Sequence, residues 1–280
     1  MTYDLFIIGD LDRVRLTAAL ASLAGVPVTS VDVAAEDADD RNWEAQVSCT
    51  YTEVGGDVDW QLDIYLDDAI VGHPTEENAA ARLADDLDRV ILYPAPIELP
   101  SAYFLAAPGG LVTRARLFRD DDAKYQLDAV ERAVPRLPSV PVAAQPEVIR
   151  EYPVPAPITA ALGDLPGPRA LALLGAWENL TSRMVSGWPP DGWYPVEFYA
   201  EDLGVRDELA DSVERLPADA VGPVRAALEK IDEHFRTLTE DDIESTLAGL
   251  LGISRIDLRL REWWWRRIPN PVPWPGPASN

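Results

Sequence analysis

The chain has 280 residues, and its 47% hydrophobic content is typical of globular proteins and argues against wholesale disorder. It carries 48 Asp and Glu against 24 Lys and Arg, a formal net charge of −24. Such a field repels polyanions, which argues against nucleic acid and anionic membranes as partners and favours a basic protein or a cation. With only two lysines, Lys124 and Lys230, the residue usage is that of a GC-rich genome, which explains part of the acidity.

Cys49 is the sole cysteine, so no disulfide can form within the chain. The first residues lack the basic start and the apolar run of a signal peptide, and no window reaches the roughly 18 apolar residues that span a bilayer. We therefore expect a cytoplasmic protein, and its length is sufficient for two domains.

The first elements alternate between strand and helix. Residues 3–8 are expected to form an apolar strand, followed by a helix that Asp10 caps and Gly25 ends. Residues 28–33 are typical of a second strand. Residues 36–40, with the sequence Glu-Asp-Ala-Asp-Asp, are expected to form an acidic loop.

The clearest pattern is a twofold alternation of apolar and polar residues over 43–51 and again over 58–66. Gly55, Gly56 and Asp57 separate the two runs. Period two on both sides of such a turn predicts a β-hairpin with one buried and one solvated face.

A second helix is expected from Thr75, whose hydroxyl is a suitable N-cap, and a strand at 90–93 follows it. The order βαββαβ up to this strand suggests a ferredoxin-like sandwich. A further hairpin, 102–106 with 111–118, extends the sheet, and a short helix at 124–134 closes the domain.

The predicted fold class is therefore α+β, with a ferredoxin-like domain over residues 1–134 and an all-α domain over 158–268. Seven prolines between 135 and 157 exclude a helix interior or a central strand and indicate a semi-rigid linker. Residues 269–280 form a proline-rich tail. The helices expected in the second half are 171–185, 196–203, 205–216, 218–236, one capped by Thr239, and 254–267.

Three carboxylates, Asp57, Asp59 and Asp63, are placed on the solvated face of the first hairpin. Carboxylates two and four residues apart along a strand could bind a hard divalent cation through oxygen or serve as an acid–base pair. The alternative is an ordinary solvated face, because no histidine or glycine loop completes a recognised cation motif.

Acidic runs elsewhere are candidate docking surfaces for a basic protein, because complementary charge raises the association rate and the selectivity. The alternative for each run is a solvated surface without a partner. The carboxylates in these runs are Glu36, Asp37, Asp39, Asp40, Asp120, Asp121 and Asp122, with Asp85, Asp86 and Asp88 on a predicted helix.

Catalytic signatures are missing from the sequence. His73 and His234 cannot form a helical zinc pair, and neither a G-x-S-x-G elbow nor a nucleotide-binding glycine loop is present. His234 is expected to be a half-buried packing residue and Cys49 a small core hydrophobe. No cofactor is expected.

Tryptophan is concentrated in the C-terminal half. Trp193 lies in an aromatic, proline-rich loop, and Trp263, Trp264 and Trp265 are consecutive on an expected helix. Three adjacent helical positions span about 200° of the circumference, so they cannot all face one core stripe. With Trp264 on the inner face beside Leu260, Trp263 or Trp265 must meet the other domain, the proline-rich tail or a partner. Trp beside Arg is typical of binding hot spots.

These features resemble, in character rather than in any shared motif, the small acidic cytoplasmic immunity proteins that neutralise bacterial toxins. Proteins of that kind bind a toxin through carboxylates and aromatic residues and carry no active site. The matching features are the acidic runs 36–40 and 120–122 and the run Trp263–Trp265.

The leading hypothesis is therefore a non-catalytic module that binds a basic protein, plausibly as an immunity-like inhibitor of a basic toxin. Its binding residues would be the two acidic runs together with Trp193, Trp263 and Trp265. The alternative hypothesis is a carboxylate-rich enzyme, with or without the assistance of a metal ion, that uses the three hairpin aspartates with His73 or His234.

Overall fold

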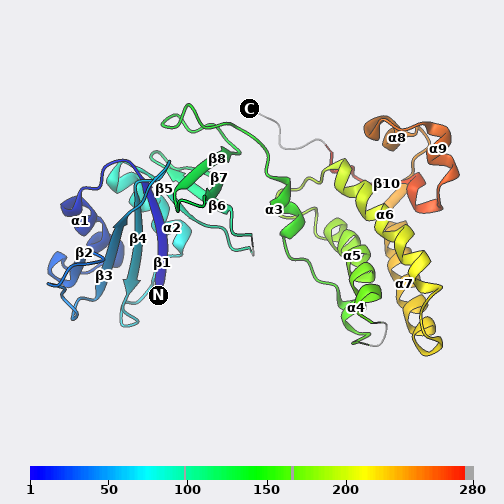
Figure 1. The fold of residues 1–280 in the computed structure, drawn as a ribbon, viewed down its shortest axis with the longest axis horizontal. Helices are drawn as coiled ribbons and strands as arrows, with labels where there is room; N and C mark the ends of the chain where they lie inside the picture. The colour runs from blue at the N-terminus through cyan, green and yellow to red at the C-terminus, as the bar shows by residue number, and fades with distance from the viewer. Residues whose placement is uncertain (98, 165–166, 275–280) are drawn as a thin grey trace. The chain divides into compact units, whose positions relative to one another are not determined.

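The structure is a computed structural model that describes residues 1–97, 99–164 and 167–274 (Figure 1). The chain divides into two compact units, Met1–Glu151 and Tyr152–Asn280, which we describe separately. The fold is mixed α+β, as expected. In neither unit do the described helices offer a stretch long and apolar enough to cross a bilayer.

The described part of the first unit is built on an eight-stranded sheet with the order β2-β3-β4-β1-β5-β6-β7-β8. Neighbouring strands are antiparallel except β2 and β3, which run parallel. The elements are β1 Thr2–Ile8, α1 Arg13–Ala24, β2 Val31–Ala35, β3 Val47–Glu53, β4 Trp60–Leu66, α2 Glu76–Leu87, β5 Val90–Pro94, β6 Ala102–Ala107, β7 Leu111–Arg119, β8 Tyr125–Val130 and α3 Pro146–Glu151.

Both predicted hairpins are present, as β3–β4 and β6–β7. The three strands expected between the first two helices are present as β2, β3 and β4, so the order is βαβββαβ, one strand more than the order βαββαβ counts. The two helices pack on one face of the sheet, where Leu16 and Leu20 of α1 and Leu83 of α2 join Leu5 and Ile64 in a buried core.

The helix ends follow capping chemistry. Thr75 is the N-cap of α2 as predicted, and its hydroxyl accepts a hydrogen bond from the backbone N–H of Asn78. The cap of α1 is Asp12 rather than Asp10, since the Asp12 carboxylate accepts from the N–H groups of Val14 and Arg15. A cap two residues later shortens the helix at its start.

The predicted helix at 124–134 is wrong, because residues 125–130 form the strand β8. Tyr125, Leu127 and Ala129 are buried, while Gln126 and Asp128 between them are exposed. This is the period of a strand rather than of a helix.

A second, smaller core lies on the face of the sheet opposite the helices. Successive strand residues point to opposite faces, so Phe6 lies opposite its neighbour Leu5. The Phe6 ring packs against Tyr103 and Tyr125, at ring-centre distances of 5.8 and 4.7 Å. Strands β6 to β8 supply most of this core.

The turn between β3 and β4 is joined to the last strand of the sheet. The N–H of Tyr125 donates to the carbonyl of Gly55, and the N–H of Asp57 donates to the carbonyl of Tyr125, both at 2.7 Å. The Asp57 carboxylate also accepts from the N–H of Leu127. Gly56 lies between these bonds with φ of +100°, and a Cβ there would collide with the Tyr125 carbonyl oxygen.

The predicted linker 135–157 is not extended throughout. Its first part belongs to the first unit, where the carbonyl of Pro141 accepts from the N–H of Val130 and the helix α3 follows. Val148 and Ile149 of α3 are buried. The boundary between the units therefore falls within the predicted linker, after Glu151.

The described part of the second unit is mainly helical. Its elements are α4 Pro157–Ala160, α5 Pro168–Val185, α6 Val196–Val213, α7 Ala218–Leu238, β9 Thr239–Asp241, α8 Thr246–Leu251, α9 Arg255–Leu260, a 3-10 turn η2 Trp263–Arg266 and β10 Arg267–Pro269. The two helices expected at 196–203 and 205–216 are one, because buried residues continue at helical spacing through Gly204. That packing outweighs the roughly 1 kcal/mol cost of a mid-helix glycine.

The second unit is not all-α, because β9 and β10 form an antiparallel pair in which Arg267 lies opposite Asp241. Thr239 therefore begins a strand, whereas a helix cap was expected. Asp242 instead carries the capping role, since its two carboxylate oxygens accept from the N–H groups of Thr246 and Leu247 at the start of α8.

We predict that Gly56→Ala lowers the free energy of unfolding by about 2–4 kcal/mol, because it combines positive-φ strain with a backbone collision. Gly72→Ala is the matched control, since Gly72 also has a positive φ, of +81°, but nothing lies within 4 Å of its Cβ position. The control should cost about 1 kcal/mol. Equal losses in urea unfolding would show that the β3–β4 turn is not locked to β8.

Candidate functional site

The solvated face of the β3–β4 hairpin forms the floor of a hollow of about 650 Å³ in the first unit, which we call the acidic hollow. The loop after β2 and the turn between β7 and β8 complete its walls. Its lining residues are Glu36, Thr50, Thr52, Glu53, Val54, Gly55, Gln61, Asp63, Arg119, Asp122, Ala123, Lys124 and Tyr125.

This arrangement unites carboxylates that the sequence places far apart. Glu36 comes from the first acidic run, Asp63 from the hairpin and Asp122 from the second acidic run. The Thr52 hydroxyl donates to the Glu36 carboxylate at 3.2 Å. Because β8 joins the β3–β4 turn, the loop that carries Asp122 is held beside the polar face of the hairpin.

Asp4 adds a further carboxylate next to the floor of the acidic hollow. It pairs in register with Asp63 on the neighbouring strand, and its side chain accepts from the Gln61 amide at 3.1 Å. Burial raises the pKa of Asp4 most, the Gln61 hydrogen bond lowers it, and the charge of Asp63 raises it further. The net direction is upward.

Two cations on the rim were not identified from the sequence. Arg119 and Lys124 line the acidic hollow, and neither forms an ion pair with a carboxylate inside the described ranges. Arg119 lies over the Tyr125 ring, 5.6 Å from its centre. The alternation of residues 125–130 was the signal that could have placed both at the turn of a hairpin.

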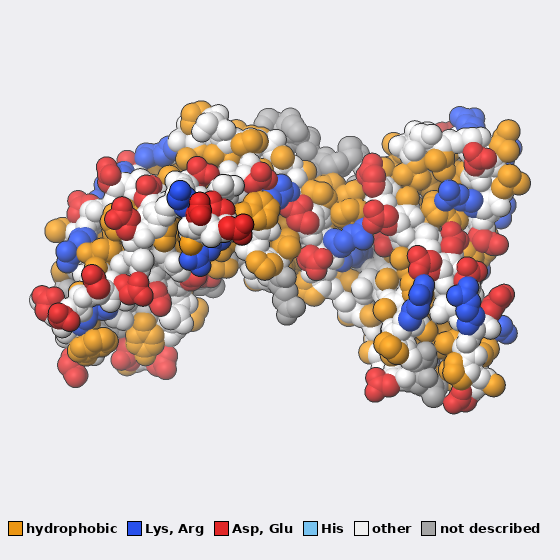
Figure 2. All heavy atoms as spheres, in the orientation of Figure 1, with side chains coloured by type: hydrophobic (Ala, Val, Ile, Leu, Met, Phe, Trp, Pro, Cys, Tyr) orange, Lys and Arg blue, Asp and Glu red, His pale blue; other side chains and the backbone are white. Residues whose placement is uncertain are grey.

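The remaining acidic residues of the two runs have different roles. Asp37, Asp39 and Asp40 are exposed in the loop between β2 and β3. Asp120 shapes the turn before β8, where its carboxylate accepts from the N–H of Lys124 at 2.8 Å. Figure 2 shows Asp and Glu side chains at many points on the visible face of this unit. Only part of each run therefore reaches the acidic hollow.

The three hairpin aspartates do not converge on one point. The Asp57 carboxylate accepts from Leu127 on β8, and that of Asp59 accepts from the N–H of Gly9 at the end of β1. Asp63 alone of the three lines the acidic hollow. Across the residues that the structure describes, no group of three His, Cys, Asp or Glu side chains is arranged to hold a metal ion.

The histidines and the cysteine lie away from any shared site. Cys49 is fully buried, as predicted for a core hydrophobe, and burial raises the pKa of its thiol well above the ordinary value. His234 is exposed rather than half-buried, because it lies on the outer face of α7. His73 is partly buried in the loop before α2.

The tryptophan run is a core element rather than a free surface. Residues 263–266 form a 3-10 turn instead of continuing the helix α9, and Trp264 and Trp265 are both buried. Their indole N–H groups donate to the two carboxylate oxygens of Asp207 on α6, each at 2.9 Å. Leu260, expected on the inner face beside Trp264, is 81% exposed.

The two other tryptophans named as partner-binding residues are partly buried. Trp263 packs edge-on against Phe235, and the guanidinium of Arg236 lies 3.9 Å from the centre of its ring. Trp193 lies in the loop between α5 and α6, which was expected to be aromatic and irregular. Among Trp193, Trp263 and Trp265, only Trp265 is buried, so it cannot belong to a partner-binding surface.

A buried ion pair lies beside this cluster. Arg206 of α6 donates to both carboxylate oxygens of Asp232 on α7, at 3.0 and 2.8 Å, and the indole of Trp177 donates to the same carboxylate. The Arg206 guanidinium also lies 4.2 Å from the centre of the Trp264 ring. These contacts join α5, α6, α7 and η2.

Comparison of the chain with protein-family models, with curated proteins and with solved structures gave no match.

We predict that Asp4→Asn raises the melting temperature at neutral pH, because it removes a charge directly opposite Asp63 and keeps the acceptor for Gln61. Because the pKa of Asp4 is raised in the folded state, its ionised carboxylate destabilises the fold at neutral pH. This destabilisation declines as the pH falls through the folded-state pKa towards the ordinary value of 3.8. The gain should thus shrink between neutral pH and about pH 4. Asp86→Asn, at an exposed carboxylate of α2, is the control, and a gain independent of pH would contradict the prediction.

We predict that Asp207→Ala lowers the free energy of unfolding of the second unit by about 2–4 kcal/mol, because two buried indole N–H groups lose their acceptor. Asp211→Ala, one turn further along α6 at an exposed position, should change it by less than about 0.5 kcal/mol. Tryptophan fluorescence during urea unfolding measures both. A similar small effect in the two variants would mean that Asp207 does not hold the tryptophan run.

Proposed function

We propose that this chain is a non-catalytic module that binds a basic protein through the acidic hollow of its first unit, plausibly as an immunity-like inhibitor of a basic toxin in the cytoplasm. The observation that carries the proposal is the convergence of carboxylates from three distant segments on one hollow. The first unit also holds 28 Asp and Glu against 12 Lys and Arg, so the same unit carries most of the excess negative charge.

Charge supports this proposal in two ways. At long range, the negative field attracts a cationic surface and raises the association rate. At short range, Glu36, Asp63 and Asp122 can accept hydrogen bonds from Lys or Arg side chains of the partner. Arg119 and Lys124 on the rim then favour partners that place an acidic or neutral group opposite them. Binding would inhibit by covering the basic surface of the partner.

The fold of the first unit supports a rigid binding surface. We propose that β1, β3, β4 and β5 with α1 and α2 are a ferredoxin-like core, enlarged by β2 at one edge and by β6 to β8 at the other. In support, these strands follow the order β3-β4-β1-β5 with antiparallel neighbours. The enlargement at the second edge is what supplies the wall of the acidic hollow.

The test is co-expression and titration calorimetry with the product of the neighbouring gene, chosen as the candidate basic partner. A variant with Glu36→Gln, Asp63→Asn and Asp122→Asn should bind at least about tenfold more weakly than the unchanged chain, because each lost contact is charge-assisted. A control variant with Asp68→Asn, Glu77→Gln and Asp86→Asn removes the same charge from exposed positions outside the acidic hollow.

The control should lose affinity only to the extent that long-range attraction weakens, and salt should remove that difference. Equal loss in both variants would assign binding to net charge alone and overturn the role of the acidic hollow. Failure to bind any basic partner at low salt would overturn the proposed function itself.

A further inference from the structure

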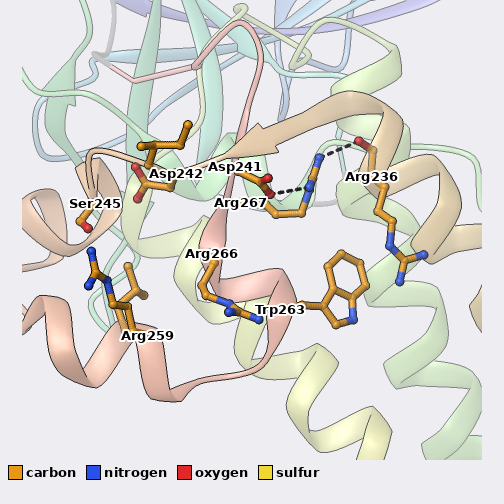
Figure 3. Close-up of a pocket in the computed structure, with 10 residues that line it drawn as sticks. Arg236, Asp241, Asp242, Ser245, Arg259, Trp263, Arg266 and Arg267 are labelled. Carbon is orange, nitrogen blue, oxygen red and sulfur yellow. Dashed lines mark hydrogen bonds and ion pairs between the residues drawn. The ribbon is translucent and has the colours of Figure 1, made fainter.

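A second hollow, of about 690 Å³, lies in the second unit and has the opposite character (Figure 3). We call it the arginine hollow. Its lining residues are Arg236, Asp241, Asp242, Ile243, Ser245, Leu258, Arg259, Trp263, Arg266 and Arg267. Four arginines from α7, α9, η2 and β10 thus meet in a chain whose net charge is −24.

Both carboxylates of the arginine hollow are already engaged. Asp241 pairs with Arg267 at 2.8 Å, and the two oxygens of Asp242 accept the N–H groups that open α8. Arg267 makes further hydrogen bonds to Thr239 and to the carbonyl of Arg236. The side chains of Asp241, Asp242 and Arg267 therefore already have hydrogen-bond partners within the protein.

The other three arginines are free to receive a ligand. Arg236, Arg259 and Arg266 are exposed, and they form no ion pair with any described residue. Figure 3 shows these three arginines spread across the arginine hollow, with Trp263 between the side chains of Arg236 and Arg266 in this view. In a strongly acidic protein, unpaired cations gathered around one hollow are the unusual feature.

The backbone that carries these arginines is held in place. Arg266 directly follows Trp264 and Trp265, whose indoles are fixed to Asp207, and it precedes the hydrogen-bonded Arg267. Trp263 packs against Phe235 and under Arg236. Fixed attachment points reduce the ordering cost of binding, although the arginine side chains themselves must still be immobilised.

We propose that the arginine hollow binds a small phosphorylated molecule, of the size of a nucleoside monophosphate. Guanidinium groups match phosphate oxygens with paired hydrogen bonds, and a dianion suits several cations better than a single carboxylate does. The volume is within the range of small-molecule sites. This proposal is independent of the protein-binding function, because it concerns other residues in the other unit.

The experiment is titration calorimetry of the full chain at low salt with adenosine monophosphate, ribose 5-phosphate, adenosine and inorganic phosphate as separate probes. The two organic phosphates should bind, adenosine should not, and inorganic phosphate should compete with both. Binding of adenosine alone with the same affinity as its monophosphate would overturn the proposal, since the ring rather than the phosphate would then be recognised.

Arg259→Gln with Arg266→Gln should weaken binding of the organic phosphates by at least about tenfold, because two charge-assisted contacts are lost. Arg215→Gln with Arg225→Gln removes the same charge from exposed positions outside the arginine hollow, one in the turn after α6 and one on α7, and should leave the affinity nearly unchanged. Equal weakening in both double variants, or no binding of any phosphate by the unchanged chain, would overturn the proposal.

Discussion

Arg206 and Asp207 are neighbours on α6 with opposite charges; Arg206 is buried and Asp207 is partly buried, and both find partners within the second unit. An uncompensated buried charge costs several kcal/mol, so the surrounding chain is arranged to supply those partners. Asp232 meets Arg206, while the indoles of Trp264 and Trp265 meet Asp207. Residues 264–267 are thereby attached to the helices, and the backbone that carries Arg266 is held in place.

The first unit depends on a similar attachment made by the backbone. The backbone of Gly56 pairs with Tyr125 of β8, and a side chain at position 56 would collide with the Tyr125 carbonyl oxygen. The consequence is that the turn between β7 and β8 lies beside the polar β3–β4 face, which becomes the floor of a hollow rather than an open surface. Carboxylates separated by more than 80 residues, Glu36 and Asp122, then line the same space.

Regular alternation made the hairpins of the first unit predictable, since period-two patterns and glycine turns are local signals. The strand β8 was missed, since residues 124–134 were expected to form a short helix, although Tyr125, Leu127 and Ala129 alternate with exposed residues as in a strand. The 3-10 turn at the tryptophans could not be predicted from neighbouring residues, because the indoles are held by Asp207, which lies 57 residues from Trp264. Of the proposed sites, individual carboxylates could be named from the sequence, but their convergence depends on long-range pairing.

The two hollows differ in the range over which their electrostatics act. In the function that we propose, attraction of a basic protein would use the summed field of the first unit, which acts over distances comparable to the Debye length and is screened by salt. A phosphate entering the arginine hollow approaches against the net charge of the whole chain, so only close contacts with Arg236, Arg259 and Arg266 can favour it. Salt screens that long-range repulsion as well as weakening the contacts, and the two effects oppose each other. A single chain can thus carry an acidic surface for a macromolecule and a local cationic site for a small anion, because short-range geometry rather than net charge selects the second ligand.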